Sequence, residues 1–199
     1  MQLPFALSSS EELQIDKRIE EFHAMRSADT KLWFSELCFC ILTANAQARK
    51  AIAIQEELGP EGFLSLQERE LAAVIRKHNH RFHNTKAHYI VQARKYCTIK
   101  DSIKNMTGSV AREFLVAHVK GLGYKEASHF LRNVGYSEVA IIDRHIIKFM
   151  TRYGLLEQQP KVITKKAYLE LEEKLKQFNM PLDKLDLILW YHMTGTVLK

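Results

Sequence analysis

Apolar residues recur every three or four positions along most of the chain, and this spacing is typical of amphipathic α-helices. One such run follows Ser9 and Glu12, and another follows Ser65 and Glu68. A serine with a glutamate three residues later matches the capping box that begins a helix. Both pairs therefore predict the first residues of a helix.

The rest of the chain gives the same helical signal. Asp29 or Thr30 can cap an apolar run that continues to Leu42, and YSEVAIID at 136–143 is the best β-like run but has no obvious partner. We therefore predict an all-α fold. Besides the helices around the segment described below, we expect helices over 30–42, 46–58, 84–105, 109–119, 164–178 and 181–193.

Composition narrows the class of protein. A chain of 199 residues with 46% hydrophobic residues can form one domain, or two small lobes that share a cleft. The formal net charge of +6 favours a polyanionic partner such as nucleic acid. Its three cysteines have no disulfide-framework spacing, and the N-terminus lacks the features of a signal peptide. We expect a cytoplasmic protein with no membrane segment.

The segment 119–146, VKGLGYKEASHFLRNVGYSEVAIIDRHI, contains the candidate chemistry. With the preceding residues it predicts a helix, a tight turn and a second helix, with Gly121 and Gly123 where the backbone needs a positive φ or a close approach. Unpaired amides at the start of the second helix favour a phosphate. An ordinary αα-hairpin, which also favours glycine in its turn, remains the alternative.

Lys125 lies at the expected first turn of that second helix, where the helix dipole disfavours an ammonium ion. A fraction of its side chain can then exist as a free amine, and a free amine can attack an electrophilic carbon to form a Schiff base. From position alone, a solvated lysine that merely contacts a phosphate is the preferred interpretation.

Asp143 is the partner that chain length allows. A helix over 125–134 advances about 15 Å, and an extended segment over 135–143 spans up to about 30 Å, so the chain can return Asp143 towards Lys125. The residue also precedes RHIIKFMTRYG and suits the N-cap of a helix. Its carboxylate is either a structural cap alone or also a group that stabilises positive charge or shuttles a proton.

These residues carry a family resemblance. KGLGYKEASHFLRNVG followed by AIIDRH resembles the helix-hairpin-helix and glycine/aspartate signature of base-excision DNA glycosylases, specifically the second family of 8-oxoguanine DNA glycosylases. LCFCILTANAQA and WYHMTGTVLK resemble the same family. The resemblance implies a single glycosylase unit over 1–199, in which two helical subdomains flank a DNA-binding cleft and 111–135 form the helix-hairpin-helix motif.

The resemblance also implies a reaction. The enzyme would excise 8-oxoguanine and then cleave the DNA 3′ to the abasic site as a lyase, with Lys125 as the Schiff-base nucleophile and Asp143 assisting base departure. The backbone at Gly121 and Gly123 would grip the phosphate, with a monovalent cation held by hairpin carbonyls. Because the chain has no cysteine after Cys97, we predict no iron–sulfur cluster of the kind found in related glycosylases.

A flipped-out base needs a pocket, and the resemblance suggests its residues. Lys199 would reach into the pocket and Trp190 would stack on the base. Phe82 would form the opposite face, and Asn45 would fill the place that the base leaves. The alternatives are a frayed chain end for Lys199 and core packing for Trp190.

We expect a monomer that binds double-stranded DNA containing 8-oxoguanine, and no metal site. The histidines at 78, 80 and 83 lack cysteine or carboxylate neighbours at ligand spacing. Two other functions stay open: a sister glycosylase for another oxidised base, or a non-catalytic helix-hairpin-helix module that binds DNA through phosphates.

Overall fold

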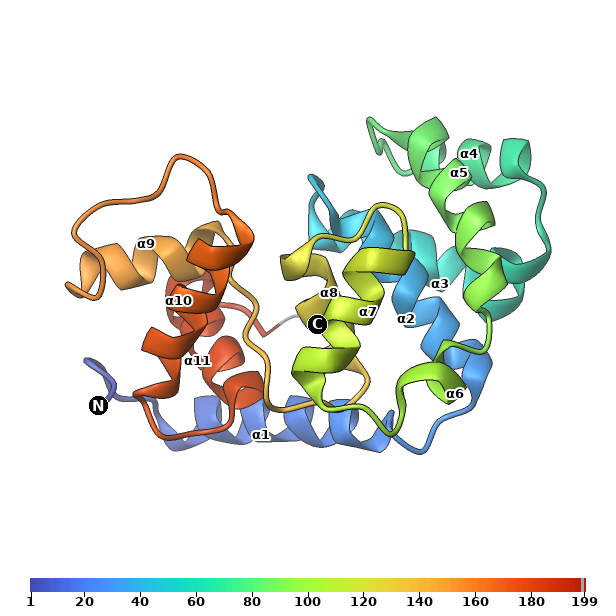
Figure 1. Cartoon of the computed structure of the whole chain (residues 1–199). Helices are drawn as coiled ribbons and strands as arrows, with labels where there is room; N and C mark the ends of the chain where they lie inside the picture. Colours follow the sequence, from blue (N-terminus) through green and yellow to red (C-terminus); the bar gives the residue numbers. More distant parts are fainter. Residues whose placement is uncertain (198) are drawn as a thin grey trace.

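The structure is a computed structural model that describes residues 1–197 and 199. It is all-α, as the sequence predicts, and the described residues contain no strand (Figure 1). The elements are α1 (Ser9–Ala24), α2 (Thr30–Thr43), α3 (Ala48–Ser65), α4 (Glu68–Lys77), α5 (His83–Ala93), the 3-10 helix η1 (Arg94–Tyr96), α6 (Ile99–Ile103), α7 (Gly108–His118), α8 (Tyr124–Asn133), α9 (Arg144–Arg152), α10 (Lys165–Lys176) and α11 (Leu182–Thr194).

Helix α2 forms the centre of the larger hydrophobic core. It packs against α3, α5, α6 and α8, and side chains on all its sides, including Trp33, Phe34 and Phe39, are buried. A helix that is covered all round has no need of a polar face, which explains its almost continuous apolar sequence. Cys38 and Cys40 are buried there, and burial raises the pKa of both thiols.

A second hydrophobic core joins α9, α10 and α11, and a third, smaller one lies between α1 and α11. Figure 1 shows α9, α10 and α11 on one side and α2 to α8 on the other, with α1 running below both groups. We propose that these two groups are the two helical subdomains. No helix among the described residues is both long and apolar enough to cross a membrane.

The start of α1 corrects the predicted cap by one residue. Ser8, rather than Ser9, is the N-cap, and its backbone N–H donates to Glu11 Oε2 over 2.6 Å. The sequence SSSEE contains the capping-box spacing in two registers, Ser8 with Glu11 and Ser9 with Glu12. Spacing alone therefore did not select the correct register.

The predicted capping box at Ser65 and Glu68 is wrong. Ser65 is the last residue of α3, and its hydroxyl donates to the carbonyl oxygen of Glu61 over 2.8 Å. Helix α4 instead follows Gln67, whose backbone N–H donates to Glu70 Oε2 over 2.8 Å. A serine at a helix end can bond back to its own helix, and this removes it as a cap.

Two further segments differ from expectation. The predicted helix over 84–105 is divided into α5, η1 and α6. At Gly59 the chain turns out of helical geometry, with φ 58°, and a further helical turn follows from Pro60 within α3. The expected end of the helix at Gly59 is therefore a kink. A proline is tolerated in a first helical turn because its missing N–H has no partner there.

The segment 136–143 crosses between the two groups of helices without forming a strand. Side chains of α10 replace a partner strand: Glu172 Oε1 accepts from the N–H of Ala140 over 2.7 Å, and Tyr168 Oη accepts from the N–H of Ile142 over 3.1 Å. The β-like pattern therefore reflects a buried crossing whose polar backbone groups are hydrogen-bonded by side chains.

Candidate active site

The hairpin between α7 and α8 depends on Gly121. Its φ is +92°, and a Cβ atom at this position would lie 2.5 Å from Tyr89 Cδ2 of α5. Both the left-handed backbone and the lack of space exclude a side chain without a local shift. The sequence expectation for Gly121 is therefore met in both respects.

Gly123 does not meet the same expectation. Its backbone is extended, with φ −95° and ψ −174°, and a Cβ atom would contact only the carboxylate of Glu126, at 3.2 Å. Its N–H lies 3.3 Å from Glu126 Oε2. The N–H groups of Tyr124, Lys125 and Glu126 donate to no described residue. The start of α8 therefore presents free amides, as a phosphate site requires.

Lys125 is the second residue of α8, as predicted, and its side chain is 31% exposed. Its Nζ atom lies 3.0 Å from Glu126 Oε1, a pairing that the sequence did not predict. An ammonium group has no free electron pair and cannot act as a nucleophile. A reaction that needs the free amine must therefore break or reorganise this ion pair.

Asp143 is the N-cap of α9, as predicted. Its Oδ1 atom accepts from the N–H groups of both His145 and Ile146, over 2.8 and 2.9 Å. Oδ2 accepts no hydrogen bond from the described residues. One oxygen is thus sufficient for the structural cap, and the other remains available for chemistry.

No ion pair joins Lys125 to Asp143, and each acts on a different buried titratable group. Burial lowers the pKa of His129, and the nearby positive charges of Arg132, Lys125 and Lys199 lower it further. Burial also raises the pKa of Asp186 to about 7, and the negative charge of Asp143 acts in the same direction.

Asp186 belongs to a buried polar cluster. Asp186 contacts Arg132, and Arg132 Nη2 donates to Asn133 Oδ1 over 3.1 Å. Asn133 Nδ2 in turn donates to Glu36 Oε2 over 2.9 Å. Helices α2, α8 and α11 thus contribute to one connected set of buried polar side chains, and Asp143 lies near the Asp186 end of it.

Lys199 is held in place, although it is the last residue of the chain. Its Nζ atom lies 2.5 Å from Glu36 Oε1 and 4.6 Å from the centre of the Phe39 ring, both on α2. The same Glu36 oxygen accepts from Gln55 Nε2 over 3.0 Å. The alternative of a frayed end is therefore wrong for this residue.

The other predicted pocket residues do not form a single cluster. Trp190 is half-buried in the C-terminal half of α11, its ring centre 4.7 Å from that of His145, and its Nε1 has no partner among the described residues. Phe82 is 38% exposed and stacks with Arg81, while Asn45 is exposed after α2 with φ 59°. No aromatic contact among the described residues joins Phe82 to Trp190.

The sequence did not identify several polar residues near the predicted site. Glu36 contacts Lys199, and Gln55 and Asn133 both donate to Glu36. Lys86 on α5 is buried close to the charges of Lys125 and Glu126. Burial lowers the pKa of Lys86 to about 8. Glu36 could have been found in the sequence as a charged residue within an otherwise apolar helix. A charged residue is seldom buried without a partner, so its position indicates a buried polar contact.

The described residues contain no group of three or more histidine, cysteine, aspartate or glutamate side chains arranged for a metal. Of the three closely spaced histidines, His78 Nε2 contacts Glu57 Oε2 at 2.7 Å and His80 Nε2 contacts the Leu42 carbonyl oxygen at 2.9 Å. These two rings therefore have structural partners.

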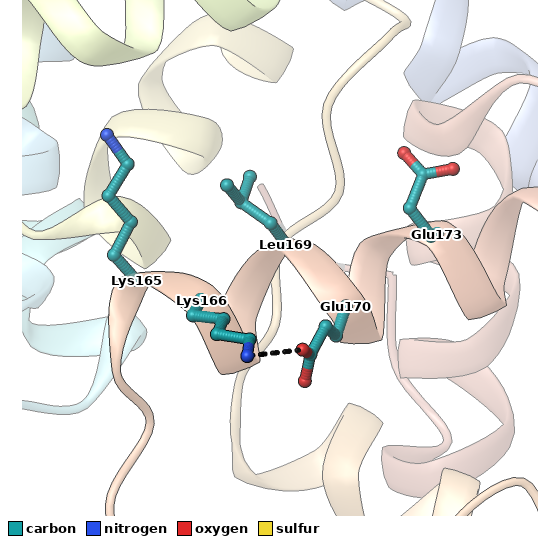
Figure 2. A pocket seen from close by; sticks show the side chains of 5 residues that line it. All are labelled: Lys165, Lys166, Leu169, Glu170 and Glu173. Atoms are coloured by element: carbon teal, nitrogen blue, oxygen red, sulfur yellow. Dashed lines mark ion pairs between the residues drawn. The ribbon is translucent and has the colours of Figure 1, made fainter.

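A surface hollow of about 510 Å³ lies along α10. Figure 2 shows that its side chains all come from this one helix, with Lys166 and Glu170 paired across a turn at 3.9 Å. None of the predicted site residues lines this hollow. A surface formed by one helix encloses nothing, so we do not assign the base pocket to it.

The chain is similar to known proteins over most of its length. A family model described as 8-oxoguanine DNA glycosylase matches residues 15–184. The 8-oxoguanine DNA glycosylase/AP lyase of Methanocaldococcus jannaschii is 49% identical over 190 residues, which cover 93% of this chain and 91% of that protein. The enzyme of the same name from Aquifex aeolicus is also 49% identical, over 83% of this chain and 78% of its own.

Solved structures give the same result. The Methanocaldococcus jannaschii enzyme in complex with a 15mer DNA containing 8-oxoguanine matches with a TM-score of 0.91 and 47% identity, over 96% of this chain and 94% of that one. Endonuclease III bound to DNA matches with a TM-score of 0.57 at 20% identity, which is a likeness of fold alone. The chain therefore belongs to the 8-oxoguanine DNA glycosylase family.

Proposed function

We propose that this protein is a DNA repair glycosylase and AP lyase that excises 8-oxoguanine through Lys125 and Asp143. The membership of the family gives the reaction class, and the geometry of the two side chains supports their roles. The single observation that carries the assignment is that Asp143 Oδ1 alone accepts both cap hydrogen bonds, which leaves Oδ2 free to act on the substrate.

In the first step the Lys125 amine attacks C1′ of the damaged nucleotide. The bond from C1′ to the base breaks, and the base leaves with the bonding electron pair and takes up a proton. The amine nitrogen loses a proton, and the sugar ring opens at the bond from C1′ to O4′, which gives the Schiff base. Loss of a proton from C2′ and cleavage of the bond from C3′ to oxygen then cut the strand on the 3′ side. Lys125 begins paired with Glu126, so DNA binding must free the amine.

Asp143 stabilises the positive charge that develops on the sugar as the base leaves, and it can accept a proton from the attacking amine. Its cap hydrogen bonds fix the carboxylate at the start of α9. A fixed negative charge costs little reorganisation during the reaction, which is the usual advantage of electrostatic stabilisation in an enzyme.

The hairpin supplies the DNA grip. Free amides at the start of α8 face an incoming phosphate, and the carbonyl oxygens of Lys120, Gly121 and Leu122 accept no hydrogen bond from the described residues. Oxygen ligands of this kind suit a hard cation. A monovalent cation bound there would add positive charge for the phosphate, and no step of the reaction runs through it.

On the base side, Lys199 supplies a donor to the flipped base and Trp190 supplies a stacking surface. Phe82 forms the opposite face of the base pocket, and Asn45 fills the place in the duplex that the flipped base leaves. An exposed aromatic side chain and an exposed polar residue are available for contact with DNA. We also propose that the protein acts in the cytoplasm, where it meets its DNA substrate, and that it acts as a monomer.

Borohydride reduction of the Schiff base tests this function. The wild-type chain is incubated with duplexes that each carry one lesion: 8-oxoguanine, an oxidised pyrimidine, or a preformed abasic site. We expect excision and a trapped adduct with 8-oxoguanine above the oxidised pyrimidine. A higher yield with the pyrimidine would favour a sister glycosylase, and binding without any adduct would favour a non-catalytic module.

A further inference from the structure

We propose that Glu36 is a positioning residue for base selection, which fixes the Lys199 ammonium group in the base pocket. This inference rests on the proposed function of Lys199. Glu36 itself neither attacks the sugar nor replaces Lys125, and its effect reaches the base through the lysine that it holds.

The site around Glu36 is built from three separate parts of the chain. Lys199 Nζ and Gln55 Nε2 share Glu36 Oε1, at 2.5 and 3.0 Å, and Asn133 Nδ2 contacts Oε2 at 2.9 Å. The Glu36 residue is only 8% exposed. Its carboxylate therefore has three donors, which satisfy a charge that would otherwise be costly to bury.

Lys199 needs such an anchor if its ammonium group is to stay in one place. A lysine side chain loses considerable rotamer entropy when it is fixed. In this structure the ammonium group is held between the Glu36 carboxylate and the face of the Phe39 ring. Both contacts come from α2, the most deeply buried helix, so they hold the terminus against a rigid element.

A fixed ammonium group can distinguish bases. One of its N–H groups points to Glu36, which leaves two donors for a ligand. 8-Oxoguanine has a carbonyl oxygen at C8 that guanine lacks. A donor held in one place favours the base with the matching acceptor, whereas a mobile lysine adapts to either base and discriminates less.

A second polar group near Phe39, the His129 ring, has a nitrogen atom without a hydrogen-bond partner among the described residues. His129 is buried, packs edge-on against Phe39 at 5.5 Å between ring centres, and its Nε2 has no partner among the described residues. Buried polar atoms ordinarily have hydrogen-bond partners. An unpaired nitrogen beside Phe39 and Lys199 is consistent with a place that a polar ligand occupies.

The test compares Glu36→Gln with deletion of Lys199, alone and together. Single-turnover rates are measured on duplexes with 8-oxoguanine, with guanine at the same place, and with a preformed abasic site. We expect Glu36→Gln to lower 8-oxoguanine excision about tenfold and to reduce its preference over guanine, because the fixed donor is lost. Strand cleavage at the abasic site, where no base fills the pocket, should fall far less.

The double variant separates positioning from general structure. If Glu36 acts through Lys199, Glu36→Gln has no further effect on selectivity once Lys199 is deleted. A multiplicative loss in the double variant, or equal losses on 8-oxoguanine and abasic DNA, would overturn the inference. So would wild-type selectivity in Glu36→Gln.

Two further variants control for folding and for the proposed role of Lys199. Glu36→Asp replaces Glu36→Gln in the test if that variant fails to fold. It keeps the negative charge but moves it back by one methylene group, so we expect a selectivity between that of the wild type and that of the Lys199 deletion. Glu61→Gln removes an exposed ion pair with Lys31, 2.6 Å apart on the surface, and should change nothing. If deletion of Lys199 alone leaves selectivity intact, the proposed role of Lys199 in base recognition is wrong. If that deletion lowers selectivity but Glu36→Gln does not, only the positioning role of Glu36 is overturned.

Discussion

The two sides of the active site are supported in different ways. The hairpin side, residues 119–125, depends on backbone conformation, because a positive φ at Gly121 and free amides at the start of α8 form the phosphate site. The pocket side depends on buried side-chain charges, with Glu36 holding Lys199. This difference predicts that changes on the hairpin side alter DNA affinity, while changes on the pocket side alter the choice of base.

Asp143 has both a backbone role and a charge: its Oδ1 atom caps α9, and its carboxylate is the proposed catalytic group. Its substitution should have the largest effect among these variants. Asparagine is an equally good N-cap, so Asp143→Asn should keep α9 and near-normal DNA affinity. We expect excision of 8-oxoguanine to fall about 100-fold, in the range found for loss of an acid–base or charge-stabilising group. Single-turnover excision and fluorescence anisotropy with labelled duplex measure the two effects.

Serine provides the matched control, because it also caps a helix but lacks a carboxylate. Asp143→Ser should match Asp143→Asn in excision if the carboxylate matters. A large loss of DNA affinity in both variants, with excision of bound DNA unchanged, would instead assign Asp143 to structure alone.

The hairpin glycines give the next largest effect. Gly121→Ala places a methyl group against Tyr89 in a left-handed backbone, and we expect a loss of about 1–2 kcal/mol in the free energy of unfolding. The displaced amides should weaken duplex binding about tenfold, with little change in the 8-oxoguanine preference of bound enzyme.

Gly123→Ala is the control, since its extended backbone admits any residue. It should weaken binding much less than Gly121→Ala. Equal losses, measured by anisotropy at one salt concentration, would show that the two glycines do not differ as their geometry predicts.

Lys86 provides the smallest expected effect and directly challenges the contrast between the two sides, because it is a buried charge close to the hairpin. Its pKa is lowered to about 8, mainly by burial and also by the charge of Lys125, against the opposing effect of Glu126. A folded-state pKa below the unfolded value means that the unfolded chain binds more protons between about pH 8 and pH 10. Stability should therefore rise with pH across that range.

Replacement by an apolar residue of similar length should remove this dependence. We expect Lys86→Met to raise the free energy of unfolding at pH 7 by about 1 kcal/mol and to flatten the rise above pH 8. Urea unfolding at several pH values measures both quantities. A less stable Lys86→Met variant would mean that the hairpin side also relies on a buried charge.

The sequence predicted the features that local residues determine. The helical class, the hairpin at Gly121, the first-turn position of Lys125 and the cap at Asp143 all follow from short-range patterns. Capping-box spacing was ambiguous at Ser8 and misleading at Ser65, because neighbouring serines and glutamates offer more than one register.

The pocket side was less predictable for a physical reason. Glu36, Gln55, Asn133 and Lys199 are far apart in the chain, and only the packing of α2, α3 and α8 brings the first three to the terminus. Periodicity identifies which face of a helix is buried but gives no pairing between distant polar residues. Family resemblance pointed to Lys199 but left its anchor unidentified.

Locating the covalent adduct tests the central claim most directly, because the structure offers two nearby amines. Lys125 is partly exposed at the hairpin, whereas Lys86 is buried with a lowered pKa. After borohydride trapping on 8-oxoguanine DNA, nuclease and protease digestion followed by mass spectrometry identifies the modified lysine. We predict that the reduced sugar is attached to Lys125 and that Lys125→Ala yields no adduct, while an adduct on Lys86, or one that survives Lys125→Ala, would contradict the account.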